Sequence, residues 1–130
     1  MHSAPQDIRP EGFPGQRLVI VPPAIAVRAA RLPVTRDLCV THIGAFVAAG
    51  EHLVERPRGT SQHILIACIS GHGACTLDSQ DWNLGPGDLL FLPPRKRHLY
   101  RANPASPWTI FWVHFRGLRA DDYLANLGVS

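Results

Sequence analysis

The stretch from Gly85 to His98 constrains the fold of this chain more than any other part of its sequence. It opens with the turn pair Pro86-Gly87, in which proline fixes one φ angle and glycine is free to take a positive one. The almost wholly apolar run Asp88–Leu92 then predicts a short strand that is buried on both faces. Pro93-Pro94 ends that strand, because neither proline can donate a hydrogen bond to a β-ladder.

A second extended run begins at His98, after the basic turn Arg95-Lys96-Arg97. Turn, strand, proline stop and strand in such close succession are typical of an all-β domain. The composition agrees, because 12 prolines and 11 glycines in 130 residues favour short elements joined by tight turns. Hydrophobic residues make up 45% of the chain and charged residues only 18%, which argues against disorder and is enough for one core.

Short apolar runs between turn signals recur along the chain at spacings of about 8–12 residues, and they predict roughly eight strands. This pattern favours a β-sandwich or a jelly-roll barrel. His63–Ile69 is apolar on both faces and is expected to be a central strand. The other expected strands are Leu18–Val21 (an edge strand), Leu38–Val47, Ala74–Leu77, His98–Arg101 and Trp108–Phe115.

Other segments are assigned from local signals. Ala24–Pro33 is ambiguous, because its alanines permit a helical turn but prolines bound it. Glu51–Gly59 is predicted as a polar segment that ends in a turn, and Ser70–Gly73 as a hairpin turn. Alternation within Leu38–Val47 assigns Val40, His42 and Phe46 to one face, and Cys39, Thr41 and Ile43 to the other.

The two ends of the chain differ from its middle. Residues 1–17 are polar and rich in Pro and Gly, and they predict a flexible N-terminal arm. Residues 18–117 form the predicted barrel. Apolar residues among charges from Leu118 to Leu127 are typical of an amphipathic helix, so residues 118–130 are the expected start of a C-terminal helix.

Several classes of protein are disfavoured by what the sequence lacks. The net charge is +3, but the arginines are scattered and no helix-turn-helix or zinc-finger pattern is present. No apolar run approaches the roughly 20 residues of a membrane span, and no signal peptide is evident, so we expect a cytoplasmic protein. Three cysteines without a paired motif, Cys39, Cys68 and Cys75, are expected to be buried free thiols.

Three segments together resemble the N-terminal effector-binding domain of AraC-type transcription regulators. They are Glu55-Arg56-Pro57-x-Gly59, the motif Pro86–Pro94 with His98 and Tyr100, and Trp108–Gly117. The pattern Gly85-x-Gly87-Asp88-x4-Pro93-x4-His98 is also similar to the second conserved motif of cupins. The resemblance covers most of residues 9–128.

The resemblance implies a cupin-type jelly-roll barrel (a double-stranded β-helix) that senses a small, sugar-like effector. In this family a C-terminal region with two helix-turn-helix units binds DNA, and this chain lacks that region. Ser130 falls where the linker and dimerisation helices would begin. The implied partners are therefore the effector, DNA only through the missing region, and a second copy of the chain as a candidate.

The resemblance also implies which residues contact the effector. Carried over from the sugar-binding members, these are Arg56, Tyr100, Ile110 and Trp112, with His98 nearby. Ile110 departs from the family, where a polar histidine stands in the sugar binder, and this favours an effector other than arabinose. Alternation independently predicts that His98 and Tyr100 share one face, as do Trp108, Ile110, Trp112 and His114.

Each candidate also has an ordinary structural interpretation. Trp112 is equally well a core residue, and Arg56 a surface arginine paired with Glu55 or Glu51. His98 and Tyr100 fit structural roles too, and His114 is interpreted as a strand-end histidine. These alternatives stay open from the sequence alone.

The competing hypothesis is a small metal-dependent cupin enzyme, such as an isomerase or a dioxygenase. Metal-binding cupins use an H-x-H pair, and the corresponding segment here offers only His52 and Glu55. No nucleophile–base pair is evident either. We therefore expect no metal, no cofactor and no catalytic residue, and we favour a ligand-sensing domain over an enzyme. A dimerisation module with a vestigial pocket is the third hypothesis.

Overall fold

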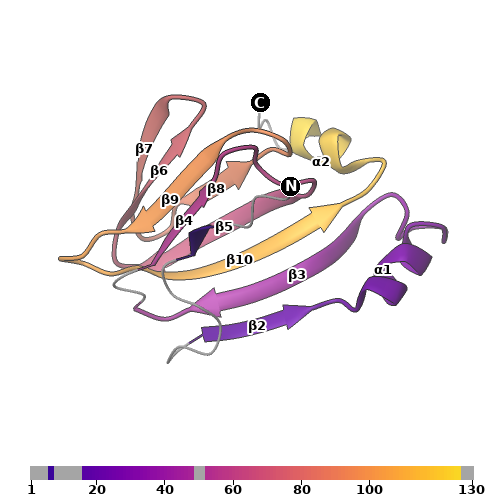
Figure 1. The fold of residues 1–130 in the computed structure, drawn as a ribbon, viewed down its shortest axis with the longest axis horizontal. Helices are drawn as coiled ribbons and strands as arrows, with labels where there is room; N and C mark the ends of the chain where they lie inside the picture. Colours follow the sequence, from indigo (N-terminus) through magenta and orange to yellow (C-terminus); the bar gives the residue numbers. More distant parts are fainter. Residues whose placement is uncertain (1–5, 8–15, 49–51, 127–130) are drawn as a thin grey trace.

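The computed structural model describes residues 6–7, 16–48 and 52–126 of the chain. Two five-stranded antiparallel sheets make up this part of the molecule (Figure 1). Sheet I has the strand order β1 (Gln6–Asp7), β4 (Leu53–Arg56), β9 (His98–Ala102), β6 (Gly73–Leu77) and β7 (Gln80–Leu84). Sheet II has the order β2 (Gln16–Ile20), β3 (Cys39–Phe46), β10 (Thr109–Arg116), β5 (His63–Ser70) and β8 (Leu89–Leu92).

The path of the chain is that of a jelly roll. From β3 onward consecutive strands alternate between the two sheets, apart from the β6–β7 hairpin. Helix α1 (Pro23–Ala29) joins β2 to β3, and helix α2 (Ala120–Asn126) follows β10 (Figure 1). The predicted all-β jelly roll with a short C-terminal helix is confirmed. Most of the predicted N-terminal arm lies outside the described residues, and the division into arm, barrel and linker helix stays a prediction.

The two helices are short and lie at the edges of the structure. The ambiguous segment Ala24–Pro33 begins with α1, which has Pro23 in its first turn, where a missing N–H does no harm. In α2, Ala120 and Leu124 are buried. Neither described helix has the length and apolar character that crossing a membrane requires.

The turn that opens the Gly85–His98 stretch has the backbone conformation that its residues predict. The Asp88 N–H donates to the Gly85 carbonyl at 3.0 Å, and Gly87 has a φ of +88°. This is a type II turn with proline at its second position and glycine at its third. The Asp88 carboxylate also accepts a hydrogen bond from the Gly85 N–H at 2.8 Å. The turn delivers the chain into β8 at Leu89.

Strand β8 is buried on one face, so the predicted burial of both faces is wrong. Leu92 is fully buried and Leu90 nearly so, but Leu89 is 69% exposed. The reason is position, since β8 lies at the edge of sheet II and pairs only with β5. Strand β5 is an interior strand as predicted, but it too buries one face, through Ile64, Ile66 and Cys68.

Two segments between strands were predicted wrongly. Part of the polar segment Glu51–Gly59 is the strand β4, whose polar side chains Glu55 and Arg56 hide its β character. The expected hairpin at Ser70–Gly73 instead carries the chain from sheet II to sheet I, because β5 and β6 are not paired.

Strand β3 does not alternate as expected. His114 of β10 pairs with His42, but Phe115 pairs with Val40, so Thr41 is an extra residue in a β-bulge. The bulge shifts the alternation by one residue, and Thr41 is buried while Val40 is 43% exposed. The start of β3 also leaves Cys39 half-buried, so the predicted burial holds for Cys68 and Cys75 only.

Candidate functional site

The space between the two sheets has an apolar part and a polar part. Buried aliphatic and aromatic side chains fill the apolar part, among them Phe46, Cys68, Trp108 and Ile110. The polar part contains side chains from four strands of both sheets, which we call the polar cluster: His42 of β3, Arg56 of β4, His98 and Tyr100 of β9, and Trp112 and His114 of β10.

Strand pairing explains why the polar side chains of sheet I meet. Arg56 lies directly opposite His98 on the neighbouring strand, so their side chains share the inner face. Nη1 of Arg56 donates to Nε2 of His98 at 3.0 Å and to the hydroxyl of Tyr100 at 3.2 Å. The guanidinium carbon lies 5.7 Å from the centre of the Tyr100 ring. Arg56, His98 and Tyr100 therefore form one connected group.

The hydrogen bond from Arg56 fixes the protonation of His98. A guanidinium has donors only, so Nε2 of His98 must be the acceptor and the ring is neutral. Burial, and to a smaller extent the positive charge of Arg56, lower the pKa of His98 to about 4, against a smaller opposing contribution from the Lys96 backbone. The side chain is only 1% exposed, so His98 is a neutral and fixed part of the wall.

The polar side chains of sheet II also meet through pairing. His114 of β10 lies opposite His42 of β3, with ring centres 4.9 Å apart. The Trp112 ring centre lies 5.3 Å from that of His114 and 5.7 Å from that of Phe46. Burial, followed by smaller contributions from Arg56, His42 and His98, lowers the pKa of His114 to about 3. The pKa of His42 is also lowered, by burial and then by Arg56.

These electrostatic couplings connect the two walls. Arg56 and His98 of sheet I depress the pKa of His114 in sheet II, so all these groups share one region between the sheets. Nε1 of Trp112 and Nδ1 of His114 are buried there, and neither has a hydrogen-bond partner among the described residues. An N–H of Trp can only donate, so this region offers unused donor capacity to a bound molecule.

The comparison with known protein families identifies the type of domain. The AraC-like ligand binding domain matches residues 44–130, which is most of the chain. The chain belongs to this family. Within this AraC-like domain, every member of the polar cluster except His42 lies in one of the three segments that resemble the family in sequence.

Two operon regulators illustrate the relationship. The MmsAB operon regulatory protein of Pseudomonas aeruginosa is 39% identical over 101 residues, which cover 75% of this chain and 33% of the regulator. The arabinose operon regulatory protein of Salmonella typhimurium is 36% identical over 67 residues, which cover 51% of this chain and 24% of that protein. The chain thus spans a third or less of the length of these two relatives.

Solved structures support the fold. KdgF from Halomonas sp. has a TM-score of 0.50 at 21% identity, over 92% of this chain and 91% of the other. A Cupin 2 conserved barrel domain protein from Salinispora arenicola has a TM-score of 0.50 at 15% identity, over 94% and 82%. At such identities the likeness shows the fold alone, and that fold is the cupin barrel of the expectation.

The structure brings four of the five expected ligand residues of the AraC-like domain into one region. Arg56, His98, Tyr100 and Trp112 all belong to the polar cluster. Ile110 shares the inner face of β10 but is fully buried within the apolar part. Their role in binding stays a prediction.

Arg56 is not held by the neighbouring carboxylate that the sequence offered as an alternative. No ion pair among the described residues includes Arg56. Its guanidinium donates hydrogen bonds to His98 and Tyr100 instead. Glu55 lies opposite Leu99, on the outer face of sheet I. Glu51, the other alternative, lies outside the described residues.

Two histidines of the cluster are not among the predicted ligand residues. The sequence interprets His114 as a strand-end residue, and alternation assigns it to the face of Trp112. His42 is not predicted to contact the effector. The signal that would have found it is the pairing of β3 with β10, and only the structure supplies that register.

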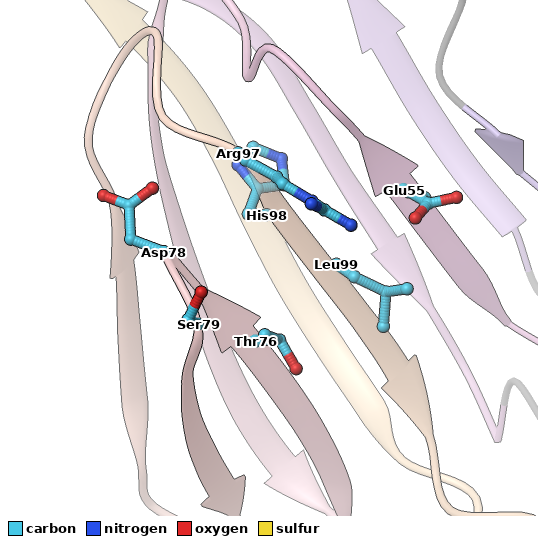
Figure 2. Close-up of a pocket in the computed structure, with 7 residues that line it drawn as sticks. All are labelled: Glu55, Thr76, Asp78, Ser79, Arg97, His98 and Leu99. Carbon is cyan, nitrogen blue, oxygen red and sulfur yellow. The ribbon is translucent and has the colours of Figure 1, made fainter.

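A separate depression lies on the outer face of sheet I. Figure 2 shows Glu55, Thr76 and Leu99 on three neighbouring strands, with the Arg97 side chain extending toward Glu55. Its volume is about 480 Å³, and it is wide open to solvent. Charges of both signs line it, and its surface is polar and apolar in about equal parts. It lacks the buried, convergent donors of the polar cluster, so we do not assign the ligand site there.

The histidines of the polar cluster are not arranged as a metal centre. In the described part of the chain, no group of three or more His, Cys, Asp or Glu side chains is arranged to hold a metal ion. His42, His98 and His114 are near one another, but His98 uses its Nε2 to accept the hydrogen bond from Arg56. The cationic guanidinium beside these rings also opposes a metal cation.

Proposed function

We propose that this chain is the effector-sensing domain of an AraC-type transcription regulator and that it binds a small molecule at the polar cluster. One observation carries the proposal: in a domain of a ligand-binding family, Arg56 joins His98 and Tyr100 and faces Trp112 and His114 across the barrel. The cluster combines an aromatic wall with a few aimed donors, which is typical of sites for small polar molecules.

The proposed contacts follow from the positions of the side chains. The guanidinium of Arg56 and the ring of His98 fix the polar groups of the effector, and the Trp112 and Tyr100 rings pack against its apolar face. Ile110 precedes Trp112 by two residues on the same face of β10, and in this proposal it forms the buried inner end of the site. Arg56 and Trp112 are half-buried, so a small molecule can reach them from solvent.

We propose that binding is coupled to the ends of the domain. Gln6 of β1 pairs with Glu55, the residue next to Arg56, and β10 leads through Gly117 into α2. An effector that binds one arrangement of these segments better than another shifts their population. In the full regulator this shift would act on a DNA-binding region outside this sequence, in the cytoplasm. A homodimer is a further proposal, which sedimentation velocity tests.

A thermal-shift screen of the purified domain tests the proposal. Sugars, sugar acids and aromatic acids are the first panel, and a true effector raises the melting temperature with the logarithm of its concentration once that concentration exceeds its Kd. Trp112→Ala should remove the response to a hit. Phe111→Ala is the matched control, because Phe111 is the preceding residue of β10 and is 52% exposed on the outer face. A hit that Trp112→Ala leaves unchanged would contradict the assigned site.

We also propose that the domain has no catalytic activity of its own. The support is that its relatives are operon regulators and that its buried Cys68 and Cys75 have raised pKa values, unlike nucleophilic thiols. Elemental analysis of the purified protein is the test. A stoichiometric transition metal would favour the metal-dependent cupin enzyme instead.

A further inference from the structure

The charges of the polar cluster are unbalanced. Its ionisable groups are Arg56 of β4, His42 of β3, His98 and Tyr100 of β9 and His114 of β10. Among the residues whose side chains the structure describes, no carboxylate belongs to this group, because Glu55 faces outward and the aspartates lie at exposed or half-buried positions. Arg56 is thus a half-buried cation that donates hydrogen bonds to two neutral partners, His98 and Tyr100.

The hydrogen-bonding groups of the cluster also favour a ligand that accepts hydrogen bonds. Arg56 and Trp112 have donors only, and Nε1 of Trp112 is buried without a partner among the described residues. Sugar hydroxyls donate as well as accept, so a sugar site needs acceptors of its own. Two ring nitrogens whose acceptor role is fixed by a donor, Nε2 of His98 and Nδ1 of the nearby His52, are already used by Arg56 and by Nε1 of Trp108. A ligand that brings acceptors and negative charge therefore complements the cation and the donors of this cluster best.

We propose that the effector is a small organic acid whose carboxylate pairs with Arg56 and accepts from Trp112 Nε1, rather than a neutral sugar. This inference rests on the proposed function, because it names the chemical class of the molecule that the same site binds. A carboxylate has two oxygens with about four acceptor positions, and guanidinium matches it in a two-point contact. The aromatic rings beside Arg56 then accommodate the rest of the acid.

A proton linkage follows from the position of the cation. Arg56 lowers the pKa of His42, His98 and His114. An anion beside Arg56 offsets its field, so the pKa of these rings rises when the anion binds. Binding of an acid that stays ionised should consequently become tighter as the pH falls from 6.5 toward about 4, the pKa of His98 in the free domain, while binding of a neutral molecule is not expected to respond in this way.

The first test needs no knowledge of the natural effector. Acetate is the smallest useful carboxylate probe, and acetamide is its neutral counterpart of nearly equal shape. The probe must stay ionised, so the NMR spectra are recorded at pH 7, well above the pKa of a carboxylic acid. Acetate at several hundred millimolar, with chloride at equal ionic strength as the reference, should shift the indole N–H resonance of Trp112 and the ring resonances of His98. Acetamide should cause much smaller shifts. Equal spectra in acetate, acetamide and chloride would overturn the inference.

The second test compares acids with neutral partners of similar size by thermal shift: lactate with lactamide, benzoate with benzamide, and gluconate with glucose. The acid of at least one pair should raise the melting temperature while its neutral partner does not. Arg56→Gln should weaken binding of that acid by roughly 10- to 100-fold, the usual effect of a lost charged hydrogen bond. Arg97→Gln is the matched control, because exposed Arg97 lies next to His98 but extends over the outer face (Figure 2).

The outcomes separate this inference from the proposed function. A neutral member that stabilises as well as its acid would overturn the organic acid and leave effector binding standing. Stabilisation by neither class, together with NMR spectra that acetate leaves unchanged, would count against both. Should Arg56→Gln fail to fold, the acetate titration of the wild-type domain still decides the question.

Discussion

The indole of Trp112 lies directly over Gly44. A Cβ built on Gly44 would be 2.3 Å from Cζ2 of Trp112 and 2.9 Å from the backbone carbonyl oxygen of Arg17. The two residues are direct partners in the β3–β10 pairing, so the absent side chain of one makes room for the ring of the other. Gly73 accommodates Trp108 in the same way, with a built Cβ 2.0 Å from Cε3. Glycines thus set the positions of two of the three tryptophans.

Gly44→Ala should therefore displace the Trp112 ring and destabilise the domain. Overpacking at a filled site typically reduces the unfolding free energy by about 1–3 kcal/mol. We expect a reduction in that range by chemical denaturation and a changed tryptophan fluorescence spectrum in the native state. Gly44→Ala in a Trp112→Phe background should be less destabilising, because the smaller ring leaves more room.

Gly85→Ala is the control for this experiment. Its built Cβ would meet only the exposed side chain of His72, at 3.3 Å, and its φ is not in the positive range. We expect a change in unfolding free energy within about 0.5 kcal/mol, as for most surface substitutions. If Gly44→Ala were as mild as Gly85→Ala, the close approach of Trp112 to β3 would be wrong.

The stability of the domain should fall in mild acid. The pKa values of His98 and His114 are lowered from 6.5 to about 4 and about 3, so the unfolded chain binds protons that the folded chain does not. The stabilisation is complete above pH 6.5 and is lost as the pH falls through the folded-state values. Each histidine contributes on the order of 3 kcal/mol of this loss between pH 6.5 and 4.

Urea denaturation at pH values from 7 to 4 measures this dependence. His114→Gln should flatten the curve, although it also lowers the stability at pH 7 if the glutamine packs poorly. The exposed His72→Gln should leave the slope unchanged. An equally steep curve for His114→Gln and the wild type would exclude His114 as a source of the acid sensitivity.

Removing the charge of Arg56 should raise the pKa values of the histidines around it. Arg56 is among the causes that lower the pKa of His42, His98 and His114, and burial is the larger cause for each. In Arg56→Met we therefore expect an upward shift of all three that still leaves them below 6.5. Histidine titration by NMR is the measurement, with Arg97→Met as the control. No shift in any of the three rings would mean that Arg56 does not face them.

The fold was largely predictable because turns and apolar runs are local signals. Pro86-Gly87 specifies a type II turn by itself, and Asp78-Ser79, with positive φ angles of 47° and 69°, closes the β6–β7 hairpin. Strand β4 was missed because each of its faces carries one apolar and one charged side chain, which gives no strand pattern. Arg56 points inward for a functional reason in our proposal, and such a residue breaks the binary pattern that strand prediction uses.

The site was less predictable, because it depends on pairing between strands that are far apart in the sequence. Alternation correctly assigned His98 with Tyr100, and Trp112 with His114, to common faces. It could not show that His42 lies opposite His114, nor that Arg56 lies opposite His98, since register is a tertiary property. The bulge at Thr41 even reversed the expected face of Val40, and no residue type in that segment signals a bulge.

The three cysteines should react in a fixed order with a thiol reagent. Only the thiolate is reactive, and burial raises the pKa of Cys75 to about 12 and raises that of Cys68 as well, with smaller contributions from Asp81 and Asp88. Cys39, near the start of β3, is half-buried. At pH 8 we expect one thiol, that of Cys39, to react first with a disulfide reagent in the native domain. Cys68 and Cys75 should react only at the rate at which the barrel opens, and in denaturant all three should react together.

Cys39→Ser should remove the fast phase, whereas Cys75→Ser should leave it intact. A fast phase that persists in Cys39→Ser would show that one of the two core thiols is accessible and that the sheets are less closed around it than their near-zero exposure indicates.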